Sequence, residues 1–134
     1  MEVKVESKIG VMRKNDEDIY SFLSDCNNFQ RFSSENEVKN WNSDSESCSF
    51  TINGVGDLIF RIVEKRPNDL IKFSIENAQV ENVFLWVQMK NTNTGSTKVK
   101  ITAKLDANPM ISMFISKPLK QGLDKVIDTL ERVC

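Results

Sequence analysis

The alternation of polar and apolar residues between residues 38 and 106 constrains the fold of this chain most strongly. Alternation with period two is typical of strands that have one buried and one solvated face. Turn-forming peptides such as SDSE, NGVG, RPND and NTNTG divide the region into strands. The predicted strands are 38–42, 46–52, 57–65, 70–77, 80–91 and 96–106. The N-terminus adds a further strand, in which Val3, Val5, Ile9 and Val11 alternate with Glu2, Lys4, Glu6 and Lys8. Together these strands predict one seven-stranded antiparallel sheet.

Turn lengths predict which face of this sheet is buried. A two-residue turn at Pro67-Asn68 pairs Ile62 with Phe73 and Phe60 with Ile75, and a three-residue turn at Gly54-Val55-Gly56 pairs Ile52 with Leu58 and Phe50 with Phe60. An even-length turn in NTNTGS sets Phe84 and Trp86 on the same face as Ile101 and Ala103. The predicted apolar face is Phe50, Ile52, Leu58, Phe60, Ile62, Ile71, Phe73, Ile75, Phe84, Trp86, Val99, Ile101 and Leu105. A slip of one residue turns a strand over, and strand 80–91 has an alternative apolar face made of Val83, Leu85, Val87 and Met89.

Helices are predicted on either side of the strand region. Ile19, Phe22, Leu23 and Cys26 form a helical stripe after a possible N-cap at Asn15, and Phe29 and Phe32 suggest a short second helix. Asn108-Pro109 opens a long C-terminal helix.

The C-terminal helix contains Pro118 and Gly122, which both weaken a helix interior. A proline kink predicts that the part beyond Pro118 packs on the sheet through Leu119, Leu123, Val126, Ile127 and Leu130. The part before it then leans over a gap and points Met110, Met113 and Phe114 into that gap. The alternative is an ordinary core helix that is kinked.

The order of strand, two short helices, six strands and long helix is that of the helix-grip fold. The segments VESKIG, FLSDCNNF, CSFTINGVGDLIFRIVEKRPNDLIKF, LWVQM and NPMISMFISKPL also resemble the START-like (Bet v 1-like, SRPBCC) superfamily. The most similar members are small bacterial proteins described as polyketide cyclase/dehydrase-like or coenzyme-Q-binding-like. The resemblance implies an α+β fold in which a curved antiparallel sheet grips the long helix around a cavity. Members bind lipids, sterols, quinones, polyketides or hormones there, usually without a metal, and the resemblance carries over no catalytic residue.

Composition narrows the functional classes. A chain of 134 residues predicts a single domain, 1–134. A net charge of -1 does not indicate binding to nucleic acid or to an anionic membrane. The absence of histidine removes the Ser-His-Asp and Cys-His arrangements. We expect no metal and no cofactor, and no membrane insertion. Three cysteines without CxxC spacing and no apolar leader predict a reducing location, the cytoplasm.

These observations favour non-catalytic transport or sensing of a small hydrophobic or amphipathic ligand. The predicted ligand-binding residues are Phe50, Phe60, Phe73, Ile75, Phe84, Trp86, Ile101, Met110, Met113 and Phe114. One alternative is a cofactor-free cyclase or dehydratase, for which Tyr20, Asp57 and Glu64 are the nominees. The other is a homodimeric protein-interaction module with a vestigial cavity.

Overall fold

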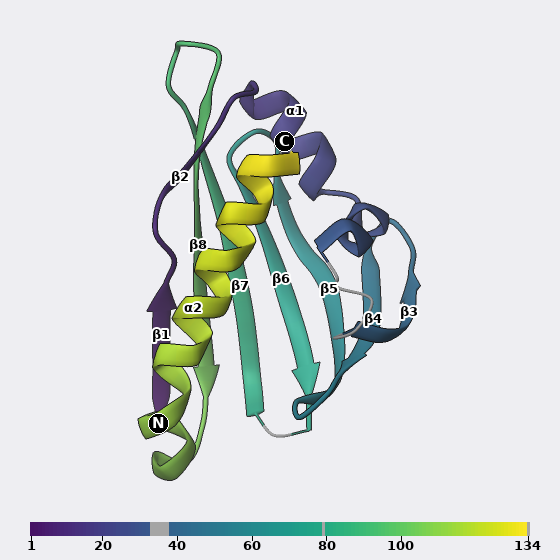
Figure 1. Ribbon diagram of the computed structural model, residues 1–134, viewed down its shortest axis with the longest axis vertical. Coiled ribbons are helices and arrows are strands. Elements are labelled where there is room, and N and C mark those ends of the chain that lie inside the picture. Colours follow the sequence, from purple (N-terminus) through teal and green to yellow (C-terminus); the bar gives the residue numbers. More distant parts are fainter. Residues whose placement is uncertain (33–37, 79, 134) are drawn as a thin grey trace.

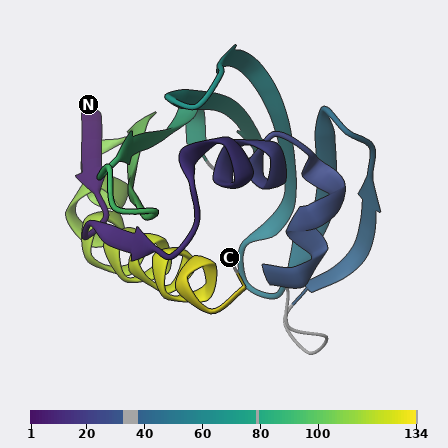
Figure 2. The same ribbon diagram turned by 90° about the horizontal axis from the view of Figure 1, so that it is seen from above.

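The computed structural model describes residues 1–32, 38–78 and 80–133 and has the α+β helix-grip architecture that the sequence predicts. The sheet is antiparallel and strongly curved, and α1, η1 and α2 all lie on its concave side (Figure 1, Figure 2). The strand order is β1-β8-β7-β6-β5-β4-β3, and β2 pairs with β8 in line with β1. The elements are β1 (Glu2–Glu6), β2 (Gly10–Met12), α1 (Asp16–Leu23), η1 (Cys26–Phe32), β3 (Val38–Ser43), β4 (Ser47–Ile52), β5 (Gly56–Arg66), β6 (Leu70–Asn77), β7 (Val80–Asn91), β8 (Thr97–Asp106) and α2 (Pro109–Val133).

The first predicted strand is divided at Ser7, which gives the sheet eight strands rather than seven. The hydroxyl of Ser7 accepts the backbone N–H of Ile101 at 2.9 Å, a bond that a regular partner strand would supply through a carbonyl. Alternation resumes out of phase beyond this interruption. Gly10 and Met12 are therefore buried, and the prediction that Ile9 and Val11 face inward is wrong, since they are 61% and 45% exposed.

The predicted register is confirmed between β5 and β6, is shifted by two residues between β4 and β5, and is wrong at β7. Ile62 pairs with Phe73 and Phe60 with Ile75, as predicted. The turn after β4 begins one residue earlier than predicted, so Ile52 pairs with Gly56 and Phe50 with Leu58. That shift moves the partners by two residues and keeps the same side chains on the concave face.

For β7 the alternative face is the correct one. Asn91 pairs with Thr97, so the loop between them, residues 92–96, has five residues instead of an even number. Val87 consequently pairs with Ile101 and with Ile71 on the concave face. Phe84 and Trp86 pair with Lys104 and Thr102 on the convex face, and the prediction that places them inside is wrong.

Helix α2 is seated on the β1, β2 and β8 side of the sheet, and its buried residues are Leu123, Ile127 and Leu130. Asn108 caps it, because its side-chain oxygen accepts the N–H of Ile111 at 2.9 Å. The helix continues without a break through Pro118 to Val133. No helix in the described parts of the chain has the length and apolar character needed to cross a membrane.

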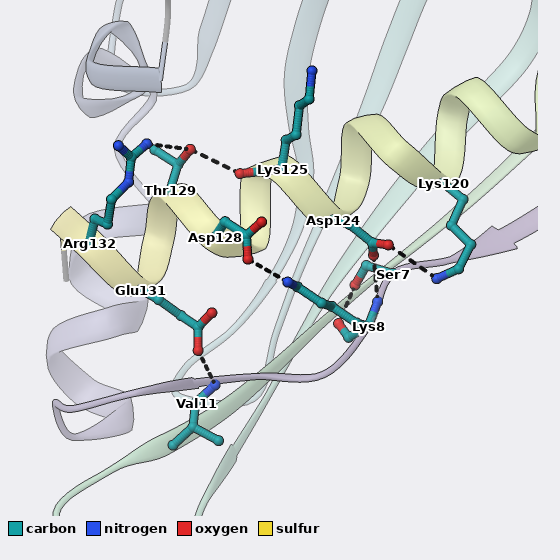
Figure 3. A network of polar contacts seen from close by, with 10 residues as sticks. All are labelled: Ser7, Lys8, Val11, Lys120, Asp124, Lys125, Asp128, Thr129, Glu131 and Arg132. Carbon is teal, nitrogen blue, oxygen red and sulfur yellow. Dashed lines mark hydrogen bonds and ion pairs between the residues drawn. The ribbon is translucent and has the colours of Figure 1, made fainter.

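Polar contacts fix α2 against β2 and the segment that joins β1 to β2 (Figure 3). Asp124 accepts the backbone N–H of Lys8 at 2.7 Å, and Asp128 forms an ion pair with the ammonium of the same lysine. Glu131 accepts the N–H of Val11 at 3.2 Å. These bonds satisfy backbone groups that have no strand partner on this side, and they set the position of α2 along the sheet.

Candidate ligand-binding face

A row of five aromatic rings crosses the concave face between η1 and β3. Trp41 stacks on Phe50 with a centroid separation of 5.3 Å, and Phe50 lies 5.5 Å from Phe60. Phe60 lies 6.5 Å from Phe73, and Phe73 lies 5.6 Å from Phe29. We call these five rings the aromatic row. Phe73 is buried, whereas the other four rings are only partly buried.

Alternation in β4, β5 and β6 turns one apolar side chain in two toward this side, which is why the rings meet. Trp41 is held by a hydrogen bond from its indole N–H to the hydroxyl of Ser43 at 3.1 Å. That hydroxyl donates in turn to the side-chain oxygen of Asn27 at 2.7 Å, so β3 is tied to η1. The aromatic row is therefore positioned by polar contacts at its outer end as well as by packing.

The structure brings together five of the predicted ligand-binding residues on the concave face. Phe50, Phe60 and Phe73 belong to the aromatic row, and Ile75 and Ile101 lie on the same face of β6 and β8. The side of α2 that faces the sheet adds partly buried Ile111, Ile115, Leu119 and Val126. Because α2 contacts β1, β2 and β8, the rings of β4 and β5 lie outside its direct cover.

The other five predicted residues lie elsewhere. Met110, Met113 and Phe114 are on the outward side of α2, where they are 73%, 78% and 70% exposed, so the prediction that they point into a gap is wrong. The seating of α2 decides this, because the sheet receives Ile111 and Ile115 instead.

Phe84 and Trp86 lie on the convex face, where lysine side chains cover them. The ammonium of Lys72 lies 4.6 Å from the centroid of Phe84 and 5.2 Å from that of Trp86, and Lys104 lies 5.8 Å from Trp86. These cation–π contacts shield the rings from water without burying them in the core.

Two open depressions lie on the surface. One of about 280 Å³ lies on the convex face beside Trp86 and Lys104. The other, of about 610 Å³, runs between β1 and α2 and is lined by Lys4, Val5, Glu6, Ser116, Lys117, Lys120, Gln121 and Asp124. Neither is lined by a residue of the aromatic row, and the sequence predicts the ligand cavity between the sheet and the C-terminal helix.

The three titratable residues named as candidates for a cyclase or dehydratase, Tyr20, Asp57 and Glu64, do not lie together in one site. Asp57 is exposed and accepts the hydroxyl of Thr51 at 2.7 Å. Glu64 pairs across the sheet with Lys72, which covers the convex rings, and forms an ion pair with Arg66. Tyr20 alone packs against the core on the concave side. Arg61 faces outward, where it forms an ion pair with Glu76.

Lys65 is a polar residue of the concave side that the sequence analysis missed. The bulge in β5 between Ile62 and Glu64 reverses the alternation, so Lys65 pairs with buried Ile71 and shares its face. Its ammonium lies 2.7 Å from Glu46. This hydrogen bond raises the pKa of Lys65, and the negative charge of Glu46 acts in the same direction. Lys65 is therefore a protonated cation at the rim of the aromatic row.

Beside this rim, η1 and β4 bring two thiols together. Cys26 and Cys48 are both buried and both free. The hydrogen bond with Cys48, together with burial, raises the pKa of Cys26, so its thiol stays protonated at neutral pH. Cys26 thus contributes apolar packing rather than a thiolate nucleophile.

This arrangement of sheet and helices matches solved structures of very different sequence. Norcoclaurine synthase from Thalictrum flavum, a point mutant in complex with a transition-state analogue, superposes with a TM-score of 0.78 over 99% of this chain and 94% of that chain at 10% identity. The same enzyme in complex with dopamine and hydroxybenzaldehyde gives 0.76 over 99% and 86% at 12% identity. A START superfamily protein from Mycobacterium smegmatis gives 0.68 over 99% of both chains at 13% identity.

The chain has the START/Bet v 1-like fold. No protein-family model matches the sequence, and no curated protein sequence does either. The identities to the solved structures are low enough that they establish the fold alone, and the function has to be argued from the site.

Proposed function

We propose that this protein is a non-catalytic carrier or sensor of a small hydrophobic or amphipathic molecule of the lipid, quinone or polyketide type. The ligand lies against the aromatic row, between the concave face of β4–β6 and the inward side of α2. The observation that carries this proposal is the partial burial of four of the five rings in the row. Large aromatic side chains on the concave side of a fold normally complete a core, and here α2 is seated over a different part of the sheet.

The surroundings of the row suit an amphipathic ligand. Aliphatic side chains of β6 and α2, such as Ile75 and Ile115, continue the apolar surface. Lys65 supplies a single cation at the rim, where it would orient a carboxylate, phenolate or quinone oxygen. An apolar wall with few polar anchors is the usual make-up of a small-molecule site. The complex of norcoclaurine synthase with dopamine and hydroxybenzaldehyde supports this, because a protein of the same fold holds small aromatic molecules.

The residue range 1–134 is proposed to form one such binding domain. We also propose that the protein works in the reducing environment of the cytoplasm. Two buried and free thiols as close as Cys26 and Cys48 support that location.

Native mass spectrometry of the freshly purified protein tests the carrier proposal. We expect a bound small molecule, and we expect lipids, quinones or polyketides that bind to raise the melting temperature. Phe50→Ser removes a partly buried ring from the row, and Trp86→Ser is its matched control on the convex face. Phe50→Ser should lose the ligand-induced shift and Trp86→Ser should keep it. A protein that is always empty, and that no member of such a library stabilises, contradicts the proposal.

A second candidate function is a cofactor-free cyclase or dehydratase. The observation that favours it is the Lys65–Glu46 pair beside Tyr20 at the rim of the row, since these groups could move protons to and from a bound molecule. Comparing the bound molecule recovered from wild type and from Lys65→Met decides between the two functions. A carrier releases the same compound from both proteins, whereas an enzyme releases product from the wild type and unconverted substrate from the variant.

A further inference from the structure

The outward side of the first half of α2 carries an unusual stripe of apolar residues. Met110, Met113 and Phe114 are spaced i, i+3 and i+4, so their side chains lie on one side of the helix, and Lys117 extends this side by one turn. We call these four residues the outer stripe. The three apolar members are, together with Met1, the most exposed large hydrophobic side chains among the described residues.

The fold itself does not need the outer stripe. The opposite side of α2 supplies the contacts with the core, through Ile111, Ile115 and Leu119. Beyond Lys117 the outward side becomes polar, with Gln121, Lys125 and Asp128 exposed. Three large apolar side chains within five residues of an exposed helix surface therefore mark a place of contact with another molecule.

Charge around the outer stripe indicates what that molecule is. Residues 107–123 include Lys117 and Lys120 and no acidic residue, whereas the acids of α2 are all at 124 or beyond. Lys117 has no ion-pair or hydrogen-bond partner in the described parts of the chain, so its charge is available. The net charge of -1 for the whole chain conceals this local separation. Asp106, which lies shortly before α2 in the sequence, and Glu2, which pairs with it across the sheet, line the depression on the convex face instead.

The open groove of about 610 Å³ between β1 and α2 adjoins the outer stripe at Lys117. Lys4, Lys117 and Lys120 line it together with Glu6 and Asp124, so its walls have an excess of positive charge. A groove of this kind beside exposed apolar side chains suits a phosphate-bearing headgroup whose acyl chains meet the methionines and the phenylalanine. A second copy of this chain suits it less, because each copy would bring lysines and no acidic side chain from residues 107–123 to the interface.

We propose that the outer stripe docks this protein on an anionic lipid surface, with α2 lying in the plane of the interface. Methionine and phenylalanine enter the boundary between headgroups and acyl chains, and Lys117 stays at the level of the phosphates. Docking is peripheral and reversible, since three side chains form a small apolar contact. This inference does not depend on the proposed ligand, because the outer stripe and the aromatic row are on different sides of α2.

Flotation of the full-length protein with phosphatidylcholine vesicles, with and without phosphatidylglycerol, tests the docking. Wild type should float with the vesicles that contain phosphatidylglycerol, and high salt should weaken this binding. The triple variant Met110→Ser, Met113→Ser, Phe114→Ser should bind roughly a hundredfold more weakly, because it loses most of the apolar contact. Lys117→Glu should weaken binding by about tenfold and reduce its salt dependence.

Matched controls are Ile9→Ser and Val63→Ser, which remove exposed apolar side chains at 61% and 52% exposure away from the outer stripe. Both should bind vesicles like the wild type. Every substituted side chain is exposed, so far-UV circular dichroism and melting should show folded proteins throughout.

Three results overturn the proposal. The first is a wild type that floats with neither kind of vesicle. The second is equal binding to both kinds of vesicle that Lys117→Glu leaves unchanged. The third, measured by light scattering, is a concentration-dependent dimer that the triple variant abolishes, which would assign the outer stripe to a second copy.

Discussion

Replacing Gly10 by alanine tests how closely α2 is seated on the sheet. Gly10 is buried in β2, and an added Cβ would clash with Cγ2 of Ile127 and lie 3.1 Å from Cε of Met12. The separation from Ile127 is far inside the roughly 3.5–4.0 Å at which two carbon atoms pack best. The methionine can move aside because its side chain is flexible. Ile127 cannot, because it is fully buried and its branched Cβ has one strongly preferred χ1 in a helix.

Two effects of opposite sign decide the size of the change. Overpacking of a well-filled core costs about 1–3 kcal/mol. Replacing glycine by alanine also restricts the unfolded chain, which stabilises the folded protein by about 0.4–1 kcal/mol. The clash outweighs the entropy because the hydrogen bonds of Asp124 and Glu131 to the β1–β2 segment hold α2 in place on both sides of the contact. We expect Gly10→Ala to lower the free energy of unfolding by about 1–2 kcal/mol.

Urea denaturation followed by circular dichroism measures this change. Gly122→Ala is the matched control, because a Cβ at that position of α2 meets no atom within 4 Å. It should raise the free energy of unfolding by about 0.4–1 kcal/mol. Adding Ile127→Leu to Gly10→Ala removes the β-branch, so the double variant should be more stable than the sum of the single changes predicts. If Gly10→Ala is as stable as the wild type, α2 does not lie on β2 as described.

Two further predictions concern titratable groups. The hydrogen bond from the backbone N–H of Lys8, with help from Lys120, holds the pKa of Asp124 below its ordinary 3.8. The stability that this carboxylate contributes is therefore complete above pH 3.8 and is lost as the pH falls through the lowered pKa. Asp124→Ala should unfold at a lower urea concentration than wild type at neutral pH, and the difference should vanish in acid. A difference in unfolding midpoint that persists in acid would show that the substitution acts through packing and not through the charge of Asp124. Iodoacetamide should label Cys26 only after unfolding, because burial and the hydrogen bond with Cys48 raise its pKa. Peptide mass spectrometry after labelling checks this. Rapid labelling of Cys26 in the folded protein would contradict the packing of η1 on β4.

The sequence predicts the order of the elements and the pairing of β5 with β6, because alternation and a two-residue turn fix both. It does not predict the face of β7, because both sets of alternate residues in that strand are apolar. Phe84 and Trp86 are the larger pair, so transfer free energy alone places them inside. The stems of Lys72 and Lys104 change that balance by covering the rings on the outside. Cross-strand neighbours of this kind are known only when the register is known. The register depends on the length of the loop between β7 and β8, which is five residues, and the turn-forming sequence NTNTG does not fix that length.

The same limit explains Lys65 and the outer stripe. Lys65 reaches the concave side because β5 contains a bulge. A bulge inserts one residue into the strand, and the alternation of polar and apolar residues does not show where that residue is. Before Pro118, α2 has apolar residues on two different sides, and helical periodicity alone does not say which side packs on the sheet. Which of them meets the sheet depends on the rotation of the helix about its axis, and this rotation is known only once Leu123, Ile127 and Leu130 are seen to be buried. With that side of α2 turned inward, and Ile127 close to Gly10, the two methionines and the phenylalanine face outward.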